Sequence, residues 1–140
     1  MQILIVYYSE SGNTKKVVDL LKHELSREHQ VTVRNALAAT TKQVEEAELL
    51  VVGTPVHGYI LFGQKPAKPI KSFLKEQLPD DLDGKPVIGF ATYLFFPAGA
   101  LNHVKKVIET RNGKLLGLIT EKRTKKPLLV RNIIKCVRDA

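Results

Sequence analysis

The stretch that decides the fold is residues 3–14, which read ILIVYYSESGNT. Its first half, Ile3–Tyr8, is a continuous apolar run that is too short for a helix and is typical of a strand buried on both faces. Its second half, Ser9–Thr14, carries polar side chains and a glycine, as turns do. Apolar residues then recur with helical spacing at Val17, Leu20, Leu21 and Leu25. A buried strand, a polar loop and an amphipathic helix therefore open the chain.

The same alternation continues along the rest of the chain. We expect a short edge strand at 31–33, one or two helical turns at 40–46, and a third strand at 49–52 that ends at Gly53-Thr54-Pro55. After a long loop, Pro69 opens a helix, since proline is tolerated in the first turn. A strand at 86–91, a helix that stops at Asn112-Gly113, a strand at 114–119 and a helix from Pro127 follow. Five strands alternating with helices predict one α/β domain over residues 1–140, with helices on both faces of a parallel sheet.

The charge of the chain is unevenly distributed. Its 140 residues are 44% hydrophobic, enough for one buried core, and its formal net charge is +8. Residues 1–100 contain eleven basic and eleven acidic side chains, whereas residues 101–140 contain eleven and three. The whole positive excess therefore lies in the last forty residues, which bears on partners rather than on the fold.

The cellular setting is inferred from the cysteine content and from the length of the apolar runs. Cys136 is the single cysteine, so no internal disulfide can form, and we expect a reducing, cytoplasmic compartment. No Cys-x-x-Cys or Cys/His cluster indicates a metal site. The N-terminal apolar run lacks the basic flank and cleavage site of a signal peptide. No stretch approaches the roughly 18 apolar residues of a bilayer span, so we expect no membrane partner.

The polar loop Ser9–Thr14 is the most informative candidate site. In parallel α/β sheets, ligands bind beyond the carboxyl ends of the strands, which singles out the loops 9–14, 53–65 and 92–99. Free amides and the dipole at a helix start favour an anion such as a phosphate. The alternative is a plain helix cap, in which Asn13 or Ser11 accepts from the first-turn amides. The Walker and dinucleotide glycine patterns are both absent.

Four segments together resemble the flavodoxin-like proteins over nearly the whole chain: Ile3–Tyr8, Ser9–Thr14, Gly53-Thr54-Pro55 and Gly84–Ala91. The resemblance implies a three-layer α/β sandwich with a five-stranded parallel sheet in the order 2-1-3-4-5. It also implies FMN as the cofactor. The residues expected around its phosphate are those of the first loop, namely Ser9, Glu10, Ser11, Gly12, Asn13 and Thr14.

The resemblance also implies that two further loops, 56–62 and 92–99, enclose the flavin ring. Thr54, in the preceding Gly-Thr-Pro turn, is expected near the ribityl chain and the ring. The cofactor-binding residues expected in this turn and the two loops are Thr54, Pro55, Val56, His57, Gly58 and Tyr59, and then Thr92, Tyr93, Leu94, Phe95 and Gly99. Tyr93 is the best stacking candidate, because its ring can lie on a ligand while its hydroxyl stays in water. Core packing is the alternative for Phe95, and a solvated loop position is the alternative for His57. Gly58 would permit a backbone turn toward the flavin, since glycine adopts positive φ without a Cβ clash.

Three functions remain open at this point. The first is an FMN-binding electron carrier between redox proteins, in which the flavin does the chemistry and no catalytic side chain is needed. The second is an FMN-dependent reductase of quinone-type acceptors that uses NADH or NADPH. The third is a cofactor-free interaction module or nucleic-acid-binding domain. The basic tail, residues 101–140, lacks the interleaved aromatic residues of nucleic-acid binders. Its basic run, Lys122, Arg123, Lys125 and Lys126, directly follows the last expected strand, at the sheet edge expected to carry the flavin. We therefore expect an acidic redox partner, the reverse of the usual flavodoxin polarity.

Overall fold

The fold is a three-layer α/β sandwich, seen in a computed structural model that describes residues 1–57, 65–93 and 99–140. Its central sheet has five long parallel strands, which are β1 (Gln2–Tyr7), β2 (Gln30–Asn35), β3 (Leu49–His57), β5 (Pro86–Tyr93) and β6 (Lys114–Lys122). They lie in the order β2-β1-β3-β5-β6. Counted along the chain as five strands, this is the expected order 2-1-3-4-5, and the expected fold class is confirmed. A two-residue strand, β4 (Lys65–Pro66), pairs antiparallel with the end of β3.

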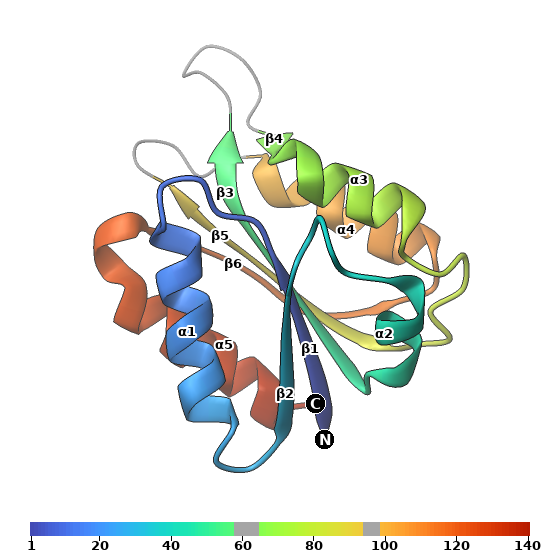
Figure 1. Ribbon diagram of the computed structural model, residues 1–140, viewed down its shortest axis with the longest axis horizontal. Helices are drawn as coiled ribbons and strands as arrows, with labels where there is room; N and C mark the ends of the chain where they lie inside the picture. The colour runs from blue at the N-terminus through green and yellow to red at the C-terminus, as the bar shows by residue number, and fades with distance from the viewer. Residues whose placement is uncertain (58–64, 94–98) are drawn as a thin grey trace.

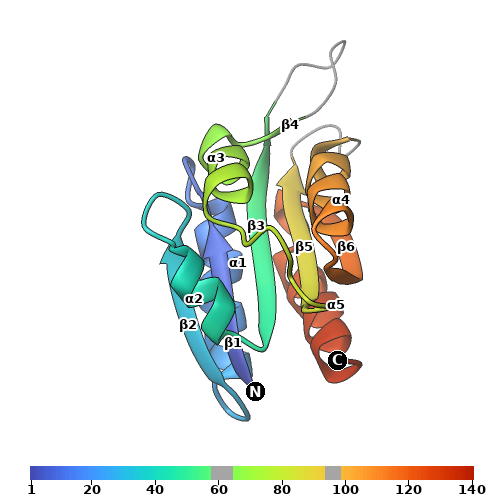
Figure 2. The same ribbon diagram turned by 90° about the vertical axis from the view of Figure 1, so that its right-hand side faces the viewer.

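Five α-helices cover the two faces of the sheet (Figures 1 and 2). One face carries α1 (Asn13–Leu25) and α5 (Lys126–Arg138), and the other carries α2 (Thr41–Glu46), α3 (Lys68–Glu76) and α4 (Ala100–Thr110). Alternate residues of β1 serve the two layers: Ile3 and Ile5 pack with α1 and α5, whereas Leu4 and Val6 pack on the opposite side. Burial on both faces explains why this strand is apolar at every position.

The edges of the sheet and the ends of the helices follow the sequence signals. β2 alternates exposed and half-buried residues, as expected of the edge strand. Pro69 and Pro127 lie in the first turns of α3 and α5. Helix α4 ends at Thr110, Asn112 just beyond it adopts φ 58, and the Gly113 amide donates to the Ile108 carbonyl at 2.9 Å. That bond and the one from Asn112 N to Glu109 O form a Schellman motif.

Four strands end later than the sequence predicts: β2 ends at Asn35 rather than at residue 33, and the expected end of β3 at Gly53-Thr54-Pro55 is wrong. β3 continues to His57, with Thr54 paired to Ala91 and Pro55 to Thr92 of β5. Pro55 is tolerated because the ladder between β1 and β3 has already ended at Gly53. Gly53 itself is required by packing: a Cβ there would lie 2.2 Å from the Phe90 ring.

β5 continues to Tyr93 and β6 to Lys122, because these two strands pair along their full lengths. Thr92 and Tyr93 therefore lie in a strand rather than in the expected loop.

One apolar residue of the first helix lies outside the core. Val17, Leu21 and Leu25 are buried as expected, but Leu20 is 44% exposed. Helical spacing placed Leu20 on the apolar stripe, and the structure shows it on the flank of α1. In the described part of the chain, no helix has the length and apolar character needed to span a bilayer.

Candidate functional site

Three buried threonines mark the carboxyl edge of the sheet. Thr14, Thr54 and Thr92 are the buried polar side chains among the described residues, each at most 1% exposed. Thr14 starts helix α1, Thr54 lies near the end of β3, and Thr92 lies near the end of β5. Buried hydroxyls need hydrogen-bond partners, and here the partners link the three elements.

The Thr14 and Thr92 hydroxyl oxygens lie 3.3 Å apart, which joins the first loop to the fourth long strand. Thr54 Oγ1 donates to the Pro55 carbonyl at 2.9 Å and accepts from the Ala67 amide at 3.0 Å. The Ala67 contact ties the end of β3 to the start of α3. Two of these anchors, Thr92 and Ala67, connect segments far apart in the sequence, so no local pattern could have predicted them. The structure thus brings the predicted phosphate loop and the strand ends of the predicted ring site to one place.

The first loop leaves the start of α1 without a side-chain cap. Gly12 is the N-cap residue with φ 87, and no side chain of the described residues accepts a capping bond there. The first helical bond runs from Lys16 N to Gly12 O at 3.0 Å. The amides of Asn13, Thr14 and Lys15 precede this bond and point out of the helix end. The plain-cap alternative, with Asn13 or Ser11 accepting from these amides, is therefore not the arrangement found.

Side chains instead shape the loop itself. Ser9 Oγ accepts from the Gly12 amide at 3.1 Å, and Asn13 Nδ2 donates to Ser11 Oγ at 2.8 Å. A Cβ on Gly12 would meet no atom within 4 Å, so the glycine is required by its positive φ and not by lack of space. Glu10 is exposed at the tip of the loop. Outward amides, nearby hydroxyls and the positive end of the helix dipole together form a donor set that suits a phosphate.

The predicted ring site is described in part. Val56 is half-buried and packs against the core that α3 and α4 cover, and His57 ends β3 opposite Lys65. Tyr93 is half-buried at the end of β5. Gly99 is the N-cap of α4 with φ 90 and no side-chain cap, so α4 begins as α1 does. The predicted contacts Gly58, Tyr59, Leu94 and Phe95 lie outside the described residues.

The comparisons with known proteins agree with this arrangement. A family model described as a flavodoxin domain matches residues 4–124. The chain belongs to the flavodoxin family. No curated protein matches it.

Solved flavodoxins share the fold of this family member. It is similar to the two-electron reduced flavodoxin of Megasphaera elsdenii, with a TM-score of 0.84, 18% identity and 99% of each chain covered. It is similar to oxidised Flavodoxin 2 of Bacillus cereus, with a TM-score of 0.80, 21% identity and again 99% of each chain covered. The flavodiiron core of Flv1 from Synechocystis sp. also matches, with a TM-score of 0.71 and 14% identity, but only 33% of that chain is covered, against 93% of this one.

Proposed function

We propose that this protein binds FMN non-covalently and carries electrons between redox proteins. The observation that carries the proposal is the start of α1, where a loop rich in hydroxyls surrounds a helix end without a side-chain cap. An anion held there by amides and hydroxyls would sit beside the buried Thr14–Thr92 pair, which fixes the loop against β5. Membership of the flavodoxin family supports FMN as the molecule that supplies this phosphate.

The residues of the chain would bind and orient the cofactor. The loop Ser9–Thr14 would hold the phosphate, with the Ser11 and Thr14 hydroxyls as donors beside the amides of the first turn. Thr54 and the ends of β3 and β5 would place the ring, and Tyr93 would cover one face of it. When bound, FMN supplies the one- and two-electron chemistry. No acid, base or nucleophile of the protein is needed for that task.

We also propose that the redox partner is acidic. Lys122, the first residue of the basic run, pairs in register with Tyr93, the predicted stacking residue. Lys122 and Lys125 are exposed, so the basic run borders the edge at which the flavin would lie. Charge complementarity of this kind steers a partner of opposite sign toward the site of electron exchange.

The state of the single cysteine supports a reducing compartment such as the cytoplasm. The single cysteine, Cys136, is a free and half-buried thiol in α5. Burial, followed by the nearby Asp139 carboxylate, raises the pKa of this thiol, so it stays protonated and poorly reactive.

Cofactor binding is tested by titrating the flavin-free protein with FMN and with riboflavin, which has no phosphate. We expect FMN to be retained through desalting, with the visible absorption bands of a bound flavin, and riboflavin to bind far more weakly. A protein that stays colourless after a soak in FMN would instead favour a cofactor-free interaction module. Equal affinity for the two ligands would contradict the phosphate site.

The carrier and the reductase are separated by turnover. The FMN-loaded protein is mixed with NADH or NADPH and a quinone acceptor. A carrier should show no steady oxidation of the nicotinamide until a protein reductase is added. Sustained turnover by the protein alone would support the FMN-dependent reductase.

A further inference from the structure

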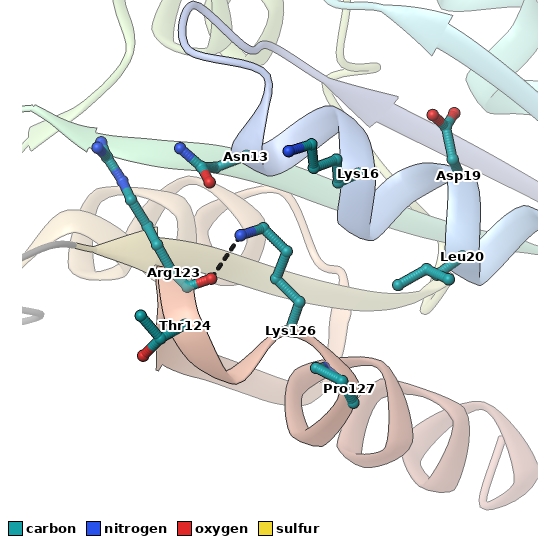
Figure 3. A pocket seen from close by; sticks show the side chains of 8 residues that line it. All are labelled: Asn13, Lys16, Asp19, Leu20, Arg123, Thr124, Lys126 and Pro127. Atoms are coloured by element: carbon teal, nitrogen blue, oxygen red, sulfur yellow. Dashed lines mark hydrogen bonds between the residues drawn. The ribbon is translucent and has the colours of Figure 1, made fainter.

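A groove of about 860 Å³ runs beside the predicted phosphate loop, between α1 and the connection from β6 to α5 (Figure 3). Binding sites for small ligands commonly span about 300–1,000 Å³. The lining residues that matter are Asn13, Lys16, Leu20, Arg123, Lys126 and Pro127. Asn13 belongs to both the groove and the phosphate loop, so the groove continues outward from the start of α1.

Three cations from three elements line this groove. Lys16 comes from α1, Arg123 from the single-turn 3₁₀ helix η1 (Arg123–Lys125), and Lys126 from the start of α5. Figure 3 shows the Lys126 side chain extending across the groove toward α1, while its ammonium donates to the Arg123 carbonyl. Burial, and then repulsion by Lys16 and Arg123, lowers the pKa of Lys126. The neighbouring charges of Lys16 and Arg123 therefore disfavour the protonated form of Lys126.

Among the described residues that line the groove, only Asp19 is acidic. Its carboxylate accepts a hydrogen bond from Lys15 at 3.0 Å on the exposed side of α1. An anionic ligand in the groove would offset the repulsion that Lys126 experiences from Lys16 and Arg123.

The end of the groove away from the phosphate loop is apolar. Leu20 lies outside the buried face of α1 and lines the groove with 44% of its surface exposed. The exposed Pro127 at the start of α5 also lines the groove there. An apolar body next to a cationic end is the pattern that a nucleotide needs, with its base on the aliphatic wall and its phosphates on the basic side chains.

We propose that this groove binds a nucleoside diphosphate. Its phosphates would contact Lys16, Arg123 and Lys126, and its base would lie against Leu20 and Pro127. Two sources share this chemistry: the ADP half of a flavin dinucleotide whose flavin end occupies the FMN site, or a separate nucleotide that binds beside FMN. The groove adjoins the site that would hold the flavin phosphate and shares Asn13 with it, but its cations and its apolar residues lie outside the loop Ser9–Thr14.

The first experiment is a calorimetric titration of the full chain with ADP, with and without FMN. Inorganic pyrophosphate and adenosine serve as the two halves of the ligand. Lys16→Gln/Lys126→Gln removes two groove cations. Lys122→Gln/Lys125→Gln is the matched control, because it removes the same charge from exposed lysines that do not line the groove. The single variant Lys16→Gln, at an exposed position of α1, covers the case in which the double variant does not fold.

ADP should bind the wild type, pyrophosphate more weakly, and adenosine not measurably. The groove double variant should lose about tenfold or more in ADP affinity, since it removes two charge-assisted contacts, and the control should lose less than about threefold. If ADP binds neither the FMN-free nor the FMN-loaded wild type, the proposal is overturned. An equal loss in both double variants also overturns it, because attraction would then follow net charge alone. Since the flavin-free chain is titrated as well, failure to bind FMN does not obscure this result.

Titrations of the flavin-free chain with FAD and FMN show whether the nucleoside diphosphate is part of the cofactor or a separate molecule. If the nucleotide is part of the cofactor, FAD should bind more tightly than FMN, and Lys16→Gln/Lys126→Gln should remove that advantage. If it is a separate molecule, FAD and FMN should bind equally and the FMN-loaded chain should still bind ADP.

Discussion

Helices α1 and α2 both follow a strand of the sheet, yet their first turns differ. At α2, Thr40 Oγ1 accepts from the Gln43 amide at 3.3 Å and Gln43 Oε1 accepts from the Thr40 amide at 3.0 Å, a complete capping box. The Thr41 amide and hydroxyl also donate to Gln77 Oε1. At α1 the N-cap is Gly12, and no side chain caps the helix.

The difference separates a structural helix end from one suited to a ligand. At the start of α2, the Thr40, Thr41 and Gln43 amides are all satisfied by side chains of the protein, which stabilises the helix and leaves few donors for an anion. The donors of α1 are held in place by Ser9, Gly12 and the Thr14–Thr92 pair, but they point outward. A phosphate is the natural partner for such donors. Four experiments probe this difference between the two helix starts.

The largest effect is expected where the α1 end meets the phosphate. Ser11→Ala/Thr14→Ala removes two hydroxyl donors, and hydrogen bonds to charged groups contribute about 1.5–3 kcal/mol each. FMN affinity should therefore fall about 100-fold or more, while riboflavin affinity changes only a few-fold. Fluorescence titration with both flavins measures this. A parallel loss for riboflavin would place the phosphate elsewhere.

The second experiment strains the turn that opens α1. Gly12→Ala forces an alanine into φ 87, and Gly84→Ala does the same at φ 74 in the turn before β5; neither new Cβ would meet an atom within 4 Å. Each should lower the free energy of unfolding by about 1 kcal/mol, the usual cost of a left-handed alanine. Only Gly12→Ala should also weaken FMN. If Gly84→Ala weakens FMN as much, the effect is one of general stability.

The third experiment removes the side-chain cap of α2. Thr40→Ala removes the acceptor for the Gln43 amide and should cost about 1 kcal/mol of stability, as measured by urea denaturation. FMN affinity should stay within about twofold of the wild type, because no ligand is expected at α2. A loss of FMN affinity comparable to that of Gly12→Ala would show that the two helix ends are not functionally distinct.

The sequence predicts the order of strands and helices well, because a strand buried on both faces is apolar at every position. Ile3–Tyr8 and Leu49–Val52 are apolar at every position, and proline or asparagine marks the helix ends at Pro69, Asn112 and Pro127. The loop Ser9–Thr14 is recognisable for a similar reason: its polar composition directly follows a buried strand.

Contacts between segments far apart in the chain could not be predicted from local sequence patterns. The Thr14–Thr92 contact spans 78 residues, and Gly53 is set by the Phe90 ring on a neighbouring strand rather than by a turn. Helical spacing likewise gives Leu20 the same weight as Leu21, although only Leu21 lies in the core cluster that α1 shares with the sheet and α5. The groove beside α1 could not be predicted, since its cations come from both ends of the chain.

The fourth and smallest effect concerns the charge around the two helix starts. Near α2, Lys42 pairs with Glu46 at 3.8 Å. Lys122, in contrast, ends β6 beside Tyr93, and Lys125 follows one turn later, both exposed. Lys122→Gln/Lys125→Gln should slow electron exchange of the FMN-loaded protein with an acidic ferredoxin-like protein by a few-fold at low salt.

The dependence of that rate on ionic strength should become shallower, because steering acts only within about a Debye length, roughly 8–10 Å near physiological salt. The matched control is Lys42→Gln/Lys75→Gln, which removes the same charge from exposed positions on α2 and α3. Stopped-flow kinetics across a salt series distinguish the two variants. If both slow the reaction equally, the partner responds to net charge. If neither does, the basic run is a solvated surface and docking depends on other residues.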